Sequence, residues 1–198
     1  MWKRMSGRRG NEPTASLSPL SPPVDALADT VERRPRFIAF DADPETDGIL
    51  KKVGGGAVRC ENGAQFSAAL ALPSTLMVVM THGFACFPEW VSDHGRGDAK
   101  QEVEIAAVAP EQFDCDALVL MVCNQYRPSA WLRRLRPGAI LASSPDLVST
   151  SAIGSFASAL LEADMTSRAQ FETIREDVGR RCSTLLSRRW VVWERKAP

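Results

Sequence analysis

Short apolar segments alternate with amphipathic and polar segments from Phe37 to the end of the chain. Two of the apolar segments, 76–80 and 118–122, contain no polar residue, which is typical of strands buried on both faces of a parallel sheet. Further strands are predicted where short, mostly apolar segments are bounded by turn residues, at 37–40, 57–60, 139–142 and 190–193. The segment 37–40 ends at Asp41.

Helical patterns fill most of the intervals between these strands, at 44–52, 66–72, 130–135, 151–163 and 168–186. Pro44 stands near the first turn of the first helix, where proline is tolerated, and the glycines at 54–56 end that helix. Segments 90–92 and 103–105 are predicted to pair as a hairpin across a turn rich in glycine and charge. Strands that alternate with helices indicate an α/β fold, with a mostly parallel central sheet and helices on both faces.

Residues 1–36 differ from the rest of the chain in composition. They hold five of the 13 prolines, and their charge is seven basic minus four acidic residues, or +3, against −3 for residues 37–198. The Pro- and Ser-rich run 13–23 cannot sustain a helix or a central strand, because each proline removes a backbone donor. We therefore predict a flexible basic tail over 1–36 and one domain over 37–198. A partner-docking segment and a cleavable propeptide are the alternatives for the tail.

The overall composition excludes several classes of function. The 198 residues include 24 basic and 24 acidic residues, so the chain has no net positive charge that would indicate binding to nucleic acid or to a membrane surface. The longest apolar run has seven residues, against the ~20 that span a bilayer, and no apolar stretch follows the basic N-terminus as in a secretory signal. The five cysteines are odd in number, are widely spaced and form no C-x-x-C pair. They favour reduced thiols in the cytoplasm over a disulfide framework or a structural zinc site.

The two most apolar strands run into reactive residues, Thr81-His82-Gly83 and Cys123-Asn124-Gln125. Reacting groups in such sheets lie beyond the carboxyl ends of the strands. If the two strands are neighbours about 4.8 Å apart, the imidazole and the thiol face each other. A cysteine peptidase needs this pair, because a thiolate attacks the peptide carbonyl while an imidazole serves as acid and base. Gly83, without a Cβ, lets its backbone approach the substrate carbonyl closely.

Other residues compete for these roles. His94 also follows a predicted strand and precedes a glycine, but its surroundings are polar, and the more apolar strand before His82 favours His82 of the two histidines. Cys60 and Cys115 are interpreted as packing residues. Cys86 lies four residues beyond His82, and a redox or metal role is the alternative to a simple loop thiol.

The order of these features resembles the caspase-like cysteine peptidase fold (clan CD), and most closely its CHAT branch, over about residues 37–195. A buried strand ending in His-Gly, an irregular hairpin and a buried strand ending in Cys-Asn carry the resemblance. A short helix, a strand beginning Gly-Ala, a polar loop, a long helix and a Trp-bearing strand complete it. The resemblance implies a three-layer fold, His82 as catalytic histidine and Cys123 as nucleophile. It also implies an oxyanion hole formed by the backbone N–H groups of Gly83 and Cys123. In the family a small residue precedes the cysteine and Ser-Gly follows Cys-Asn, whereas here Val122 precedes it and Gln125-Tyr126 follow Asn124.

The resemblance also implies a substrate pocket shaped by the loop 143–147. Ser144 and Asp146 lie in this loop, and a carboxylate at Asp146 would favour Lys or Arg before the cut through a charge-assisted bond. The alternative for Asp146 is a turn or a cap of the next helix. Asn124 beside the nucleophile and Trp90 at the edge of the cleft are the other expected substrate-binding residues. Trp90 could instead close the hairpin onto the core.

These features together predict a cytoplasmic cysteine endopeptidase that acts on a protein substrate and needs no metal or cofactor. The resemblance implies control by a regulatory or sensor protein, by oligomerisation or by cleavage of the tail. It also implies a regulated effector role in bacterial defence, such as antiviral defence, or in cell death. One alternative is an inactive caspase-like interaction scaffold, which the unusual loop after Cys123 favours. The other is a small α/β ligand-binding or hydrolase domain with a different site.

Overall fold

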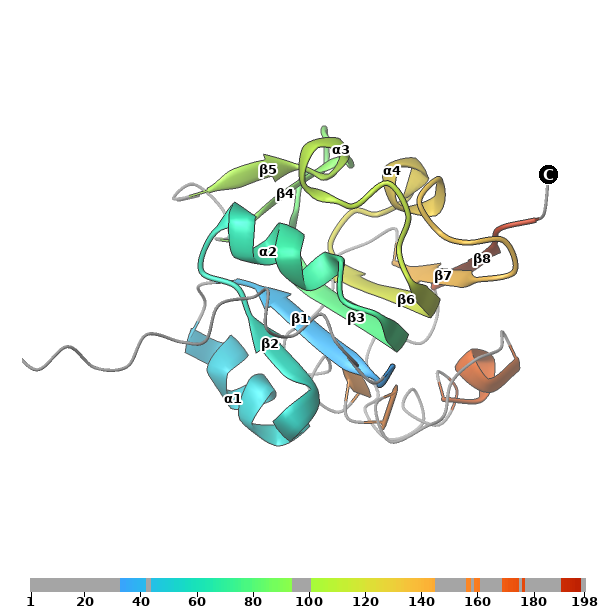
Figure 1. Cartoon of the computed structure of the whole chain (residues 1–198), viewed down its shortest axis with the longest axis horizontal. Coiled ribbons are helices and arrows are strands. Elements are labelled where there is room, and N and C mark those ends of the chain that lie inside the picture. The colour runs from blue at the N-terminus through green and yellow to red at the C-terminus, as the bar shows by residue number, and fades with distance from the viewer. Residues whose placement is uncertain are drawn as a thin grey trace, which may run out of the picture. The chain divides into compact units, whose positions relative to one another are not determined.

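A mostly parallel sheet forms the centre of the fold. The computed structural model describes residues 33–41, 44–93, 101–144, 156–157, 159–160, 169–174, 176 and 190–196. Along the main row of six strands, the first five are parallel to their neighbours and the sixth is antiparallel to the fifth. The sheet confirms the predicted α/β class. In spatial order its strands are β2 (Ala57–Arg59), β1 (Arg36–Phe40), β3 (Ser74–Gly83), β6 (Cys115–Val122), β7 (Ile140–Ser143) and β8 (Val191–Glu194), as Figure 1 shows.

A hairpin extends the sheet at the end of β3. Its strands β4 (Trp90–Ser92) and β5 (Glu102–Glu104) are antiparallel, which confirms the predicted hairpin, and Val91 lies opposite Val103. β4 also pairs with the last two residues of β3, which prolongs β3 beyond the apolar core segment. The predicted second strand ends one residue early, because Ile105 opens the short helix α3 (Ile105–Val108). His94 lies outside the described residues.

The helices follow the predicted order with shifted ends. α1 (Pro44–Val53) is followed by the 3₁₀ turn η2 (Gly54–Gly56), and α4 (Ser129–Leu132) is shorter than predicted. α2 (Gly63–Leu70) begins earlier than predicted, because the Asn62 side chain accepts a hydrogen bond of 2.9 Å from the Gln65 backbone N–H and caps the helix. Residues 156–157, 159–160, 169–174 and 176 are helical and belong to the last two predicted helices, whose other residues lie outside the described part of the chain.

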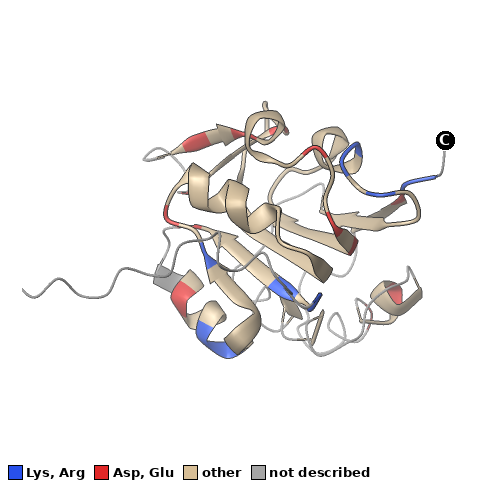
Figure 2. Cartoon of the chain, viewed as in Figure 1, with Lys and Arg blue, Asp and Glu red and all other residues tan. Residues whose placement is uncertain are grey.

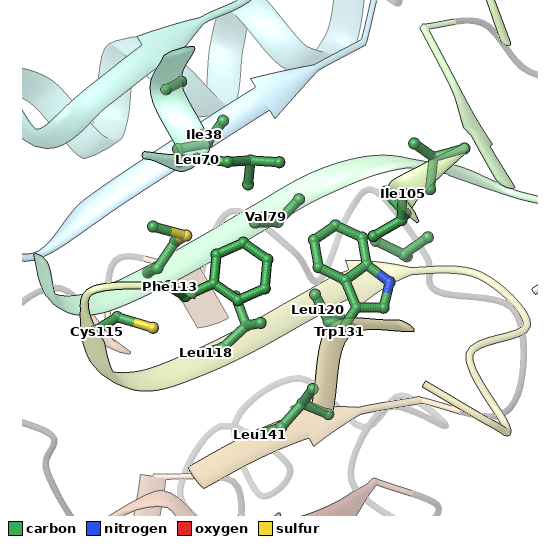
Figure 3. Packing of buried hydrophobic residues seen from close by; sticks show 14 of the residues in the cluster. Ile38, Leu70, Val79, Ile105, Phe113, Cys115, Leu118, Leu120, Trp131 and Leu141 are labelled. Atoms are coloured by element: carbon green, nitrogen blue, oxygen red, sulfur yellow. The ribbon is translucent and has the colours of Figure 1, made fainter. Parts of the chain in front are cut away.

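Two apolar clusters cover opposite faces of the sheet and give the fold three layers. Successive side chains of a strand point to opposite faces, and β1 shows this directly. Phe37 and Ala39 pack with Ile49 of α1 and Phe171, whereas Ile38 and Phe40 pack in the other cluster. Figure 1 shows α2, α3 and α4 on one face, with α1 and the C-terminal helical segments on the other. Figure 3 shows residues of the second cluster, among them Ile38, Leu70, Val79, Ile105, Phe113, Leu118, Trp131 and Leu141.

Contacts of the domain start before residue 37. The compact unit spans Glu32–Pro198, and β1 begins at Arg36. The Arg33 guanidinium pairs with Asp114 at 3.3 Å and with Asp116 at 2.9 Å. The described residues assigned to the tail from sequence, 33–36, therefore belong to the fold, and residues 1–32 lie outside the described part.

Charged residues are distributed over several elements of the described chain. Figure 2 shows acidic positions on β5 and at the turn before α2, and basic positions on α1, on β1 and after α4. Within the described ranges, no helix combines the length and the apolar character that crossing a bilayer requires.

Candidate active site

Three neighbouring strands end in chemically active residues at the same edge of the sheet. Phe40 of β1 is paired with Thr81 of β3, and Thr81 is paired with Val122 of β6. The next residue along each strand is Asp41, His82 and Cys123, respectively. Because β3 lies between β1 and β6, the position of His82 lies between those of Asp41 and Cys123 along this edge of the sheet. The strands that lead to His82 and Cys123 are therefore neighbours, as the sequence analysis required.

A buried carboxylate orients the histidine. His82 Nε2 lies 3.1 Å from Asp41 Oδ1, within hydrogen-bond distance, and Asp41 Oδ2 accepts a hydrogen bond of 2.8 Å from Thr46 Oγ1 in α1. The Asp41 side chain is 3% exposed and that of His82 is 29% exposed. A carboxylate can only accept hydrogen bonds, so this contact favours the proton on Nε2 and leaves Nδ1 as the ring nitrogen for proton exchange elsewhere.

The backbones of the two central strands come very close where the site begins. A Cβ placed on Gly83 would lie 2.2 Å from the carbonyl oxygen of Cys123 and 2.8 Å from Val122 Cγ1. No larger residue fits this position without moving the backbone of the nucleophile strand. The sequence predicts that Gly83 makes room for a substrate carbonyl, and the structure shows that the carbonyl of Cys123 also requires a glycine here.

The chain turns sharply after Cys123. Asn124 has a φ of 62°, the left-handed region that residues other than glycine seldom adopt and that asparagine tolerates best. Such conformations gather at functional sites, where the surrounding structure holds them in place. The turn places Cys123, half-buried, at the end of β6.

Burial separates the described thiols into two groups. Burial raises the pKa of the Cys60 thiol and of the Cys115 thiol to about 12, so both stay protonated near neutral pH. Cys86 is exposed and Cys123 is half-buried. Since the thiolate is the nucleophile, Cys86 and Cys123 are the described cysteines suited to react.

Gln125 ties the loop after the nucleophile to two other segments. Its backbone N–H donates to the Ser144 carbonyl at 2.9 Å, and its carbonyl accepts from Ser143 Oγ at 3.0 Å. Its side-chain Nε2 donates to the Pro88 carbonyl at 3.1 Å. The buried Ser144, predicted to bind substrate, thus supports this loop through its carbonyl. Sequence reasoning did not identify Gln125, because its partners lie far away in the chain.

Three predicted substrate-binding residues remain, and the structure describes two of them. Trp90 is 37% exposed at the start of β4, while the next residue, Val91, is fully buried, so Trp90 does not close the hairpin onto the core. Asn124 adjoins Cys123 as expected. Asp146 lies outside the described residues.

A cavity of about 340 Å³ opens beside Asp41. Arg59 pairs with Asp47 across its wall, and Asp93 Oδ1 accepts from the Gln101 backbone N–H at 3.0 Å. Among the described residues of the lining, four carry carboxylates and one, Arg59, carries a guanidinium. These described lining residues are Asp41, Asp47, Arg59, Cys60, Glu61, Asp93 and Gln101.

Asp41 was the principal residue that the sequence analysis missed. A carboxylate directly after the first predicted strand was its visible signal, but its contact with His82 depends on the spatial order β1-β3-β6.

No protein-family model matches the chain, and no curated protein matches it. The α/β fold with its mostly parallel central sheet is compatible with a caspase-like fold.

Proposed function

We propose that this protein is a caspase-like, CHAT-like cysteine endopeptidase in which Cys123 is the nucleophile and His82 the acid and base. The row Asp41–His82–Cys123 at the carboxyl edge of β1, β3 and β6 carries this proposal. The three residues combine a thiol, an imidazole beside it in the sheet and a buried acceptor that orients the imidazole. This is the general arrangement of an activated nucleophile, its base and the group that orients the base.

The proposed reaction uses these groups in two steps. The Cys123 proton passes to His82 Nδ1, the thiolate attacks the scissile carbonyl carbon, and His82 then gives the proton to the departing amine. Water attacks the resulting thioester while His82 takes a proton from it, and the carboxylic acid and the Cys123 thiol are released. In this proposal the backbone N–H groups of Gly83 and Cys123 stabilise the oxyanion.

Asp41 acts in this scheme as a positioning residue. Its hydrogen bond to Nε2 keeps Nδ1 available for the thiol proton and stabilises the imidazolium that forms after proton transfer. Thr46 holds the second carboxylate oxygen, so α1 contributes to the orientation of the histidine. The ends of the two apolar strands and the resemblance both pointed to His82 and Cys123, and the buried carboxylate of Asp41 adds a third member.

The substrate and the regulation belong to the same proposal. We expect a protein substrate with Lys or Arg before the cut, selected by Asp146, and a regulatory partner that controls activity. A regulated effector role in defence or cell death fits this kind of enzyme. These expectations follow from the resemblance.

Thiol reactivity tests the proposal against an inactive scaffold. Wild-type protein and His82→Ala are labelled with iodoacetamide at pH 7, and the labelling rate of each cysteine is read by mass spectrometry. The exposed thiol of Cys86 is the matched internal control. Activation by His82 should make Cys123 react about 10-fold faster than Cys86 or more, and His82→Ala should remove this difference. Equal rates at Cys123 and Cys86 in the wild type would favour the scaffold.

A further inference from the structure

Three large aromatic side chains are exposed close in sequence to the proposed catalytic residues. Phe87 is 63% exposed, Tyr126 is 44% exposed and Trp90 is 37% exposed. Within the described part of the chain, the other large apolar side chain with such exposure is Val191, on the edge strand β8. Exposed aromatic surface is a source of binding free energy, because its removal from water is favourable. We call Phe87, Trp90 and Tyr126 the aromatic rim.

The aromatic rim lies on the two segments that leave the catalytic residues. Phe87 and Trp90 belong to the segment that follows His82 and Gly83, and Tyr126 lies three residues after Cys123. The two segments start at Gly83 and Cys123, where a Cβ on Gly83 would lie 2.2 Å from the Cys123 carbonyl oxygen. The aromatic rim therefore lies on the two segments that begin at the proposed site of bond cleavage.

Hydrogen bonds hold the two segments of the aromatic rim together. The Tyr126 hydroxyl donates to the Ala85 carbonyl at 3.3 Å, and Gln125 Nε2 donates to the Pro88 carbonyl at 3.1 Å. Within the first segment, the Trp90 backbone N–H donates to the Phe87 carbonyl at 3.0 Å. A binding surface that is already ordered loses less conformational entropy when a ligand arrives.

The charged residue between Phe87 and Trp90 is already engaged by the protein. Glu89 Oε1 accepts a hydrogen bond of 3.0 Å from Ser129 Oγ, and the Arg133 guanidinium lies 3.8 Å from the same oxygen. These contacts direct the Glu89 carboxylate toward α4 and the residue after it. The surface that the three rim side chains themselves offer to a ligand is therefore aromatic, with the exposed Arg127 next to Tyr126 in the chain.

We infer that the aromatic rim binds a large apolar side chain, such as Leu, Met or Phe, of the polypeptide whose peptide bond Cys123 attacks. This inference rests on the proposed endopeptidase function and adds a substrate preference that is separate from any basic residue before the cut. An apolar side chain that leaves water against two aromatic faces contributes enough to change kcat/KM by about 10- to 100-fold.

The test combines cleavage with binding. A proteome-derived peptide library is digested with wild-type protein, Phe87→Ser, Phe87→Leu and Val191→Ser, and the cut sites are read by mass spectrometry. Val191→Ser is the matched control, because it makes the same kind of exposed substitution on β8. The expected result is a position rich in Leu, Met or Phe near the cut. That preference should weaken about 10-fold or more in Phe87→Ser and persist in Phe87→Leu and Val191→Ser. Identical cut-site profiles for the wild type and Phe87→Ser would overturn the inference and leave the endopeptidase function intact.

Binding to the Cys123→Ala protein separates the two proposals. Two synthetic dodecapeptides are compared by fluorescence anisotropy, one with a central Leu-Phe pair and one with Ser-Ser in its place. Tighter binding of the apolar peptide to Cys123→Ala, with loss of this difference in Cys123→Ala/Phe87→Ser, would support the aromatic rim as a binding surface. If the wild-type protein cuts no peptide while this binding is observed, only the endopeptidase function is overturned. Equal affinity for both peptides overturns the aromatic rim. A synthetic copy of residues 13–31 that binds as tightly as the apolar peptide would assign the aromatic rim to the chain's own N-terminal segment and overturn the substrate inference.

Discussion

Replacement of Asp41 by asparagine tests the role of the buried carboxylate beside His82. Asp41→Asn preserves the shape of the side chain and removes its charge, and the Asn amide can donate to Nε2 and so favour the proton on Nδ1. At 3.1 Å, the attraction between an ionised Asp41 and a protonated His82 is about 5 kcal/mol at an effective dielectric constant of ~20. Desolvation of the carboxylate offsets part of this attraction, so the net effect of such a charge-assisted hydrogen bond is about 1.5–3 kcal/mol. We therefore predict that kcat falls by about 10- to 150-fold.

The assay measures both the chemistry and the position of the proton. Cleavage of a peptide from the cut-site profile gives kcat and KM for the wild type, Asp41→Asn and Asp47→Asn. Asp47 is the matched control, because it lines the same cavity and pairs with Arg59. ¹⁵N NMR of the imidazole shows which nitrogen carries the proton, and a His94→Gln variant assigns the signals, since the chain has two histidines. The wild type should show the proton on Nε2, and Asp41→Asn should shift it toward Nδ1. Wild-type kcat together with an unchanged proton position in Asp41→Asn would refute the orienting role.

Three further predictions concern the surroundings of the site. Gly83→Ala should lower the free energy of unfolding by about 1–3 kcal/mol in urea titrations and reduce activity, because its Cβ would overlap the Cys123 carbonyl. The control Gly48→Ala should not destabilise the protein, because the space around the Gly48 Cα is open. Gln125→Leu should speed backbone hydrogen exchange in residues 85–90, because the Pro88 carbonyl loses the hydrogen bond from Gln125 Nε2. Unchanged exchange in residues 85–90 would show that the segment stays ordered without this hydrogen bond. Burial raises the pKa of Cys60 and of Cys115 to about 12 in the folded protein, so with rising pH these thiols lose their protons in the unfolded chain before they do so in the folded one. The free energy of unfolding should therefore fall above pH ~9 by up to ~1.4 kcal/mol per pH unit for each thiol. Urea unfolding at pH 8 and pH 10 checks this slope, and an equal slope in the Cys60→Ala/Cys115→Ala variant would contradict it.

Much of the sheet could be predicted from the sequence because its central strands are continuously apolar. The segments 76–80 and 118–122 are buried on both faces, which explains both their composition and their neighbouring central positions. Residues that follow such strands stand at one edge of the sheet, so His82 and Cys123 could be predicted to come together. Local capping and strand pairing set the ends of the elements: Asn62 starts α2 early, and β4 prolongs β3.

The contacts that complete the site depend on long-range order. Asp41 contacts His82 because β1 lies beside β3, although the two residues are 41 positions apart. Gln125 bonds Pro88 and Ser144, which lie on either side of it in the chain. Arg33 belongs to the fold through its ion pair with Asp116. A hydrophobic pattern records which face of an element is buried, but it does not record which polar groups meet once the strands are ordered.

Peptide cleavage by active-site variants decides whether Cys123 and His82 form a catalytic pair. Wild-type protein, Cys123→Ala, His82→Ala and Cys86→Ala are incubated with the same proteome-derived peptide library, with and without genomic-neighbour proteins as candidate activators. New peptide N-termini should appear with the wild type and with Cys86→Ala. They should be absent with Cys123→Ala and with His82→Ala. If all four proteins produce the same set of peptides under every condition, Cys123 and His82 do not form a catalytic pair.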